Sequence, residues 1–369
     1  MIRLCSFILI LFGFAFPVQA NPFPSKDYEL KVEVLSSKLD TPWALAFLPD
    51  ASILITERDG NLRLFKDGAL SKPLKGTPKV RARGQGGLLD VAIDPNFAEN
   101  RWVYLSFSEA GEGGSGTAVA RGQLNGLELQ NTQVIYRQNI KTGTGRHFGS
   151  RLVFARDGTL FITHGDRGKR PRAQDPFDHA GSIIRINPDG TIPADNPFAD
   201  GKKALPEIWS IGHRNAQGIT VHPKTGEIWT SEHGARGGDE INQPKAGKNY
   251  GWPIISYGRH YSGRKIGAGV ARDGLEQPHF FWDPSIAPSS ILFYQGDLFS
   301  KWKGDIFVGA LAFELVSRLS QDNGKITEQE RLLEGDVGRV RDIVEGPDGA
   351  LYLLTHSDSG YLLRLAPAN

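Results

Sequence analysis

The feature that most constrains the fold of this 369-residue chain is a pattern that occurs six times. Each copy has an apolar run, a turn rich in proline, aspartate and glycine, and a second apolar run. Repeats about 58 residues long, with about four strands each, are typical of β-propeller blades. The sequence therefore predicts an all-β fold, a six-bladed β-propeller with four-stranded antiparallel blades; a pair of β-sandwiches is the alternative. The copies begin at Leu45, Val91, Leu152, Ile219, Ile291 and Ile343.

A strand near the N-terminus offers a way to close such a ring. Tyr28, Leu30, Val32 and Val34 alternate with polar residues. We expect this strand to pair beside Tyr361–Leu365 in the last blade, which would remove an open sheet edge. No linker or low-complexity block divides the chain, so residues 21–369 are predicted to form a single propeller domain.

Residues 1–20 have the pattern of an export signal. Arg3 precedes an apolar run from Leu4 to Phe16, and the segment ends at Ala20 in a small-x-small cleavage pattern. We predict a signal peptide and a periplasmic or secreted mature protein. Later apolar runs are too short for a membrane helix, so no membrane insertion is expected after cleavage. Cleavage also removes Cys5, the only cysteine, and excludes disulfides and thiolate chemistry.

The charge of the mature chain excludes one class of partner. Without Arg3, the mature chain has 42 basic and 41 acidic residues, so its net charge is close to zero. Binding to nucleic acid requires a strongly positive surface, so no nucleic-acid partner is expected.

A histidine and an aspartate near the third repeat are candidates for proton transfer. His147 lies in a loop with glycines on both sides, and Asp166 follows the second strand of the same repeat. A neutral imidazole acts as a general base near neutral pH, and a carboxylate can orient it. The residues alone leave open a turn histidine with a capping aspartate.

Two arginine motifs and one acidic loop indicate charged ligands. Arg214-Asn215 and Arg339-x-Arg341 offer guanidinium forks for carboxylates, although solvated surface arginines fit the same pattern. Asp239, Glu240 and the glycine-rich stretch 234–238 provide oxygen ligands of the kind that calcium prefers. A solvated acidic loop remains the alternative there.

These motifs, taken together, resemble the soluble glucose/sorbosone dehydrogenase family that uses pyrroloquinoline quinone (PQQ), and within it the periplasmic aldose sugar dehydrogenases. The likeness extends from Thr41 to Leu365. It rests on GQGGLLDVAIDPNF, HFGSRLVF with GDRG downstream, GHRNAQG, SEHGARGGDEIN, NYGWP, PSIAPSS and GRVRDI.

The resemblance implies a reaction and a role for each matching residue. An aldose would be oxidised at C1 to a lactone, with hydride passing to the quinone and later to an external electron acceptor. His147 resembles the general base and Asp166 its orienting carboxylate. We expect a monomer or homodimer. The positions that resemble PQQ ligands are Gln85, Arg214, Asn215, Arg339 and Arg341.

The resemblance also implies calcium. Gly234 and Ala235 resemble the main-chain ligands of the cofactor calcium ion, and Glu240 and Tyr250 resemble a second, structural site. One departure concerns Ala312, which stands where some members have a lysine that reaches the quinone. Two alternatives therefore stay open, a calcium-dependent hydrolase such as a lactonase and a non-catalytic sugar- or protein-binding propeller.

Overall fold

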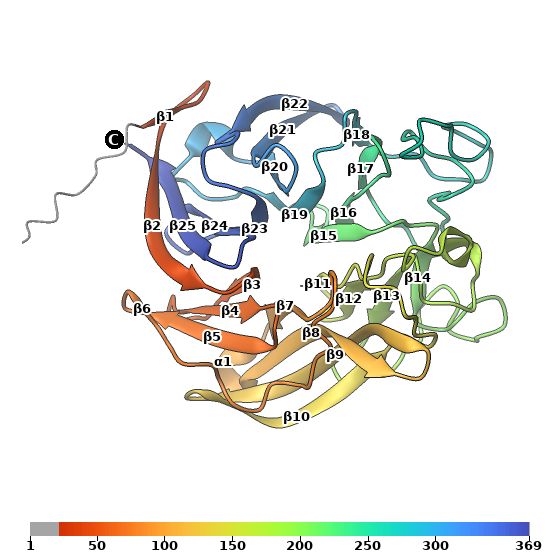
Figure 1. Ribbon diagram of the computed structural model, residues 1–369, viewed down its shortest axis with the longest axis horizontal. Coiled ribbons are helices and arrows are strands. Elements are labelled where there is room, and N and C mark those ends of the chain that lie inside the picture. The colour runs from red at the N-terminus through yellow and green to blue at the C-terminus, as the bar shows by residue number, and fades with distance from the viewer. Residues whose placement is uncertain (1–21, 369) are drawn as a thin grey trace, which may run out of the picture.

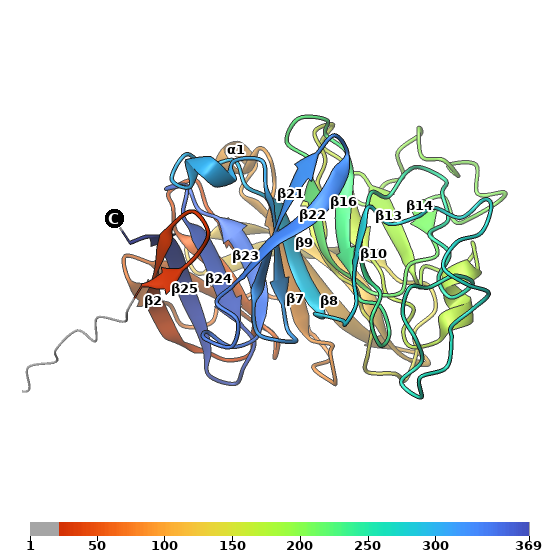
Figure 2. The same cartoon turned by 90° about the horizontal axis from the view of Figure 1, so that it is seen from above.

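Six antiparallel sheets stand in a ring around a central axis (Figure 1). The computed structural model describes residues 22–368, so the predicted signal peptide lies outside the described residues. Figure 2 shows the ring from its side, with strands of neighbouring sheets running between its two faces. The predicted six-bladed β-propeller is confirmed.

Each blade follows the chain from its innermost strand outward, except that the last blade also uses the N-terminus. The first blade contains β3 (Pro42–Phe47), β4 (Ile53–Glu57), β5 (Asn61–Lys66) and β6 (Ala69–Leu70), and the second contains β7 (Leu88–Ile93), β8 (Trp102–Gly111), β9 (Gly114–Asn125) and β10 (Glu128–Arg137). The third blade contains β11 (Leu152–Phe154), β12 (Leu160–Thr163), β13 (Ser182–Ile186) and β14 (Ile208–Ile211), and the fourth contains β15 (Ala216–Val221), β16 (Ile228–Glu232), β17 (Asp239–Asn242) and β18 (Phe280–Trp282). The fifth blade contains β19 (Pro288–Phe293), β20 (Ile306–Ala310), β21 (Val316–Asp322) and β22 (Lys325–Leu332), and the sixth contains β23 (Val340–Glu345), β24 (Leu351–Thr355), β25 (Gly360–Pro367) and β2 (Glu29–Leu39), with the short β1 (Phe23–Pro24) outside β2.

The predicted repeats correspond to the blades one by one. Each repeat begins within an innermost strand, from Leu45 in β3 to Ile343 in β23. Asp59-Gly60 lies in the turn between β4 and β5, where Gly60 has a φ of 114° that a side chain would disfavour. The short α1 (Phe97–Asn100) lies in the connection from β7 to β8.

The hydrophobic core is divided into clusters between neighbouring blades. One cluster joins Phe161 and Ile183 of the third blade to Ile219 and Ile228 of the fourth, and a comparable cluster fills each of the other five interfaces. Burial of this apolar surface stabilises the ring by roughly 25 cal/mol per Å². Each blade therefore depends on both of its neighbours.

The N-terminal strand closes the ring as predicted. β2 pairs antiparallel with β25, with Val32 opposite Leu365 (Figure 1). Before β2, the Tyr28 ring packs edge-on against Phe299 and Trp302 of the fifth blade. The two ends of the described chain thus share one blade.

Strand direction determines which loops lie together at one end of the central axis. The loops that enter the innermost strands lie on the same face as the loops between the second and third strands, because adjacent strands are antiparallel. The long connection from β17 to β18, residues 243–279, stands out from the ring beyond the fourth blade (Figures 1 and 2). No helix within residues 22–368 has the length and apolarity to cross a membrane.

Candidate active site

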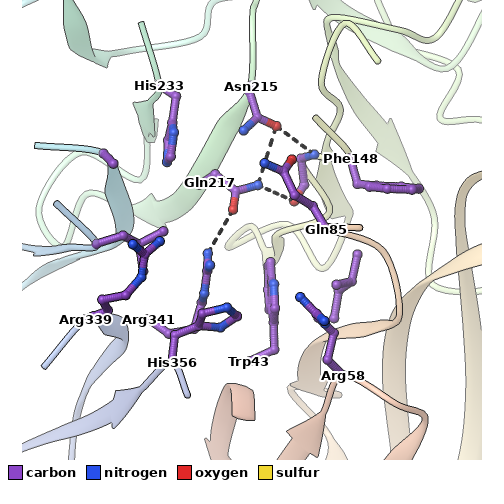
Figure 3. A pocket seen from close by; sticks show the side chains of 14 residues that line it. Trp43, Arg58, Gln85, Phe148, Asn215, Gln217, His233, Arg339, Arg341 and His356 are labelled. Atoms are coloured by element: carbon purple, nitrogen blue, oxygen red, sulfur yellow. Dashed lines mark hydrogen bonds between the residues drawn. The ribbon is translucent and has the colours of Figure 1, made fainter. Parts of the chain in front are cut away.

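A pocket of about 170 Å³ lies where these loops converge (Figure 3). Its lining comes from the starts of innermost strands and from the residues just after second strands, so all six blades contribute. Polar and cationic groups dominate, and none of the lining residues is an aspartate or a glutamate. The lining residues are Trp43, Arg58, Gln85, Leu89, Phe148, Gly149, Asn215, Gln217, His233, Ala287, Leu311, Arg339, Arg341 and His356.

A hydrogen-bond network joins three blades across this pocket. The Arg341 guanidinium donates to Gln217 Oε1 at 3.1 Å, and Gln217 Nε2 donates to the Gly149 carbonyl at 3.0 Å. The Gly149 N–H in turn donates to Asn215 Oδ1 at 3.1 Å (Figure 3). Since each link joins two different blades, the network holds the Arg341 and Asn215 side chains in place.

The electrostatics of the pocket are strongly positive. Burial and the charges of Arg151 and Arg339 lower the pKa of Arg341 to about 9, which leaves it a cation at neutral pH. Burial and nearby arginines lower the pKa of both His233 and His356 to about 3, so these imidazoles stay neutral. The pocket is therefore suited to an anionic ligand.

The predicted proton-transfer pair lies beside this pocket without lining it, and His147 directly precedes the lining residues Phe148 and Gly149. His147 Nδ1 is 2.6 Å from Asp166 Oδ1. Asp166 Oδ2 accepts a hydrogen bond from the Trp252 indole at 2.8 Å, and the Gly168 N–H donates to Oδ1 at 2.7 Å. These bonds fix the carboxylate, which directs the other imidazole nitrogen, Nε2, toward proton transfer.

Burial affects the two partners of this pair differently. Burial and the charge of Arg214 lower the pKa of His147, although the Asp166 hydrogen bond acts in the opposite direction. For Asp166, burial raises the pKa, but the hydrogen bonds from His147 and Trp252 outweigh it and lower the pKa overall. The pair is thus a neutral imidazole beside an ionised carboxylate at neutral pH.

The loop that carries His147 is held in an unusual conformation. His147 has a φ of 53°, and its N–H donates to Gln85 Oε1 at 2.7 Å. A Cβ atom at Gly165 would lie 2.3 Å from the His147 carbonyl oxygen, so this close approach requires glycine. The buried Arg167 donates to the carbonyls of Arg146 and Thr144 in the same loop.

A second, smaller cavity lies beside the pocket, and His233 lines both. Its volume of about 10 Å³ matches one water-sized particle. Glu232 and Glu240 stand opposite each other across β16 and β17, and both line this cavity. Burial, together with the nearby Glu232 charge, raises the pKa of Glu240. Two facing carboxylates in a small cavity fit a cation.

The predicted calcium ligands divide between two hollows. Gly234 and Tyr250 line the same cavity as Glu240, whereas Ala235 lines a neighbouring hollow at the surface. The Tyr250 hydroxyl donates to the Gln243 carbonyl and accepts from the Lys245 N–H, so its main-chain oxygen is the better candidate ligand for an ion. Within residues 22–368, no three His, Asp or Glu side chains gather into a metal-binding group.

The structure brings most of the predicted cofactor ligands together. Gln85, Asn215, Arg339 and Arg341 line the pocket, whereas Arg214 lines the smaller cavity. Ala312 follows the lining residue Leu311. The sequence motifs gave no role to five further lining residues, although Gln217 and His233 lie within them. Each of the five directly follows a second strand or belongs to an innermost strand: Trp43, Arg58, Gln217, His233 and His356.

Fold and site together define a class of propeller protein with a cationic axial pocket beside a histidine–aspartate pair. The chain belongs to the glucose / sorbosone dehydrogenase family, whose sequence model matches residues 39–364. The predicted resemblance and the predicted class of enzyme, a dehydrogenase, are thereby confirmed.

Individual relatives cover nearly the whole chain. Aldose sugar dehydrogenase YliI of Escherichia coli is 48% identical over 347 residues, covering 92% of this chain and 94% of that protein. The apo crystal structure of the soluble aldose sugar dehydrogenase from Escherichia coli superposes with a TM-score of 0.90 at 48% identity, over 92% of this chain and 99% of that one. The PQQ-bound aldose sugar dehydrogenase from Streptomyces coelicolor superposes with a TM-score of 0.77 at 26% identity, over 93% and 99%.

Proposed function

We propose that this protein oxidises aldose sugars at C1 to the lactone, with PQQ as the hydride acceptor and calcium as a second cofactor. The observation that carries the proposal is the His147–Asp166 pair beside a pocket that holds several arginines and no carboxylate. The names of the Escherichia coli and Streptomyces coelicolor relatives support the substrate class and the cofactor.

The residues of the pocket fit PQQ. PQQ carries three carboxylates, and Arg341 Nε is buried without a hydrogen-bond partner in the part of the chain that the structure describes. Arg339 and Arg341 would bind carboxylates, with Gln85 and Asn215 as neutral contacts and Arg214 at the neighbouring cavity. When bound, the quinone supplies a two-electron acceptor that no side chain can provide.

His147 would remove the proton from the C1 hydroxyl group of the sugar. Its Nδ1–H would donate to Asp166, so Nε2 has a lone pair ready for that proton. Loss of the hydroxyl proton to Nε2 and of the C1 hydride to the acceptor leaves the C1=O of the lactone. Asp166 stabilises the imidazolium that forms, and Trp252 keeps Asp166 in position.

The smaller cavity fits calcium. Glu240 and the main-chain oxygen of Tyr250 would bind a structural ion there. Gly234, at the same cavity, and Ala235, at the neighbouring hollow, would provide main-chain oxygens to the cofactor calcium. A hydrolase would need side-chain carboxylates around a metal-bound water in the pocket. Because the pocket lining has none, the geometry does not favour the lactonase alternative.

The direct test is reconstitution of the purified protein with PQQ and Ca²⁺, followed by aldose-dependent reduction of an external dye. We expect turnover with aldoses and a loss of at least about 100-fold in kcat for His147→Ala, because a general base contributes that much. PQQ binding by this variant, measured by absorbance after dialysis, should persist. Full activity of His147→Ala would contradict the assigned base.

Metal removal tests the calcium assignment. We expect the chelator EGTA to lower the unfolding temperature, because an ion at 100 times its Kd stabilises a protein by about 2.7 kcal/mol. Glu240→Gln should reduce this dependence on calcium, whereas Glu112→Gln, at an exposed glutamate, should retain it in full. An unchanged response to EGTA in Glu240→Gln would rule out this site.

A further inference from the structure

Arg58 is a pocket residue that no sequence motif singled out. It directly follows β4, and its main chain joins the first two blades: its N–H donates to the Thr41 carbonyl at 3.1 Å, and its carbonyl accepts from the Leu88 N–H at 2.9 Å. A Cβ atom at Gly87 would lie 2.0 Å from the Arg58 carbonyl oxygen. The backbone of Arg58 is therefore fixed at the wall of the pocket.

The Arg58 side chain has no partner among the described residues. Its Nε is buried without a hydrogen bond, and none of the ion pairs within residues 22–368 includes its guanidinium. Three other buried arginines have partners: Arg185 pairs with two carboxylates and Arg318 with three. Arg167 has no carboxylate partner, but its guanidinium donates to main-chain carbonyls. An unpaired, partly buried guanidinium lowers the stability of the folded protein unless a ligand provides its hydrogen-bond acceptors and a negative charge.

The neighbours of Arg58 add to this unbalanced charge. Arg339 and Arg341 line the same pocket and also lack an acidic partner among the described residues, and His356 beside them provides no negative charge (Figure 3). The charge of Arg58 contributes to the lowered pKa of both Arg341 and His356, which places these groups close together. Three guanidiniums around one pocket fit a ligand with several carboxylates.

We propose that Arg58 is a ligand-binding residue, and that its guanidinium, together with those of Arg339 and Arg341, binds the carboxylates of PQQ. This inference rests on the proposed function. It adds a cation from the first blade to the arginines of the sixth blade, in a protein where Ala312 of the fifth blade offers no charge. Cofactor affinity would thus depend on a residue outside every motif used to recognise the family.

Equilibrium dialysis of the calcium-loaded protein against PQQ tests the inference without any need for turnover. We expect Arg58→Met to raise the Kd for PQQ by about 10- to 100-fold, the loss expected for one charged hydrogen bond. Arg58→Lys keeps the positive charge but loses the paired N–H donors of the guanidinium. The Kd of this variant for PQQ should therefore lie between those of Arg58→Met and the unchanged protein. Lys66→Met removes an exposed charge from the same blade and should leave the Kd unchanged.

Thermal unfolding of the cofactor-free protein separates binding from a structural role. A binding role predicts that Arg58→Met unfolds at the same or a higher temperature, because repulsion with Arg339 and Arg341 is relieved, while PQQ raises this temperature less than in the unchanged protein. A lower unfolding temperature without PQQ, or a Kd within twofold of that of Lys66→Met, would overturn the inference. Failure of the unchanged protein to bind PQQ would overturn the proposed function as well.

Discussion

At the scale of single residues, the proposed chemistry depends on how His147 is held. Its positive φ is maintained by Gln85 on one side and by the close approach of Gly165 on the other. Asp166 and Trp252 then fix the imidazole plane. A general base requires this arrangement, because small displacements of the accepting nitrogen reduce the rate strongly.

The lowered pKa of His147 leads to a prediction about pH. The base is active only when neutral, so activity should fall as the pH drops through its pKa. We expect the acid limb of kcat/KM, measured by dye reduction in the reconstituted protein, to have a midpoint below 6.5. Asp166→Asn should move this midpoint lower still, because the carboxylate is what raises the pKa, and it should also lower kcat. An acid limb that stays in place in Asp166→Asn would contradict the pairing.

At the scale of elements, Arg151 joins blades beneath the pocket. It directly precedes β11 and donates to the main-chain carbonyls of Gln217 at 2.8 Å and Arg341 at 3.0 Å. Its guanidinium pairs with Asp90 at 3.1 Å and Asp342 at 3.0 Å, and these three side chains are buried. One side chain of the third blade thus contacts the second, fourth and sixth.

We predict that Arg151→Met lowers the free energy of unfolding by about 3–5 kcal/mol, because two buried carboxylates lose their counter-charge. Burial already raises the pKa of Asp90 to about 6 in the folded protein. Ionisation of Asp90 therefore lowers the free energy of unfolding as the pH rises above the pKa that this group has in the unfolded chain. The loss in Arg151→Met should therefore be larger at pH 7.5 than at pH 5. Urea unfolding at both pH values measures it.

The exposed Arg137 provides a matched control for Arg151. It pairs with Glu109 at the surface, and more than half of its side chain is exposed. We expect Arg137→Met to change the free energy of unfolding by less than about 1 kcal/mol. Equal effects of the two substitutions would show that the central ion pairs do not join the blades.

At the scale of the whole molecule, stability depends on closure by β2. A propeller without its closing strand leaves β25 as an open edge. Leu30 of β2 is fully buried in the cluster between the fifth and sixth blades, whereas Val34 of the same strand is 57% exposed. A substitution at the buried Leu30 therefore tests closure, and a substitution at the exposed Val34 of the same strand is its control.

Leu30→Ala should lower the free energy of unfolding by about 2–5 kcal/mol, because it leaves a cavity at the closing blade. Val34→Ala should change it by less than about 0.5 kcal/mol. Urea unfolding gives both values, and protease cleavage near the N-terminus should rise only in Leu30→Ala. Similar values for the two variants would mean that closure contributes little.

Much of the architecture follows from local pattern. Alternation and glycine-containing turns are properties of short segments. The six repeats and the place of the N-terminal strand beside Tyr361–Leu365 were therefore predictable. The motif loops also predicted Arg339, Arg341 and Asn215 as pocket neighbours. These loops enter innermost strands, which meet at the axis in any propeller.

The sequence by itself therefore determined the fold, the family and the pairing of His147 with Asp166. Only the tertiary structure decided that Arg58 and His356 line the same pocket, that Arg214 lies at the smaller cavity, and that Glu240 faces Glu232. The physical reason is that the ring brings together loops from all six blades that are far apart along the chain. Which of their charges remain unpaired depends on side-chain neighbours that local pattern does not specify.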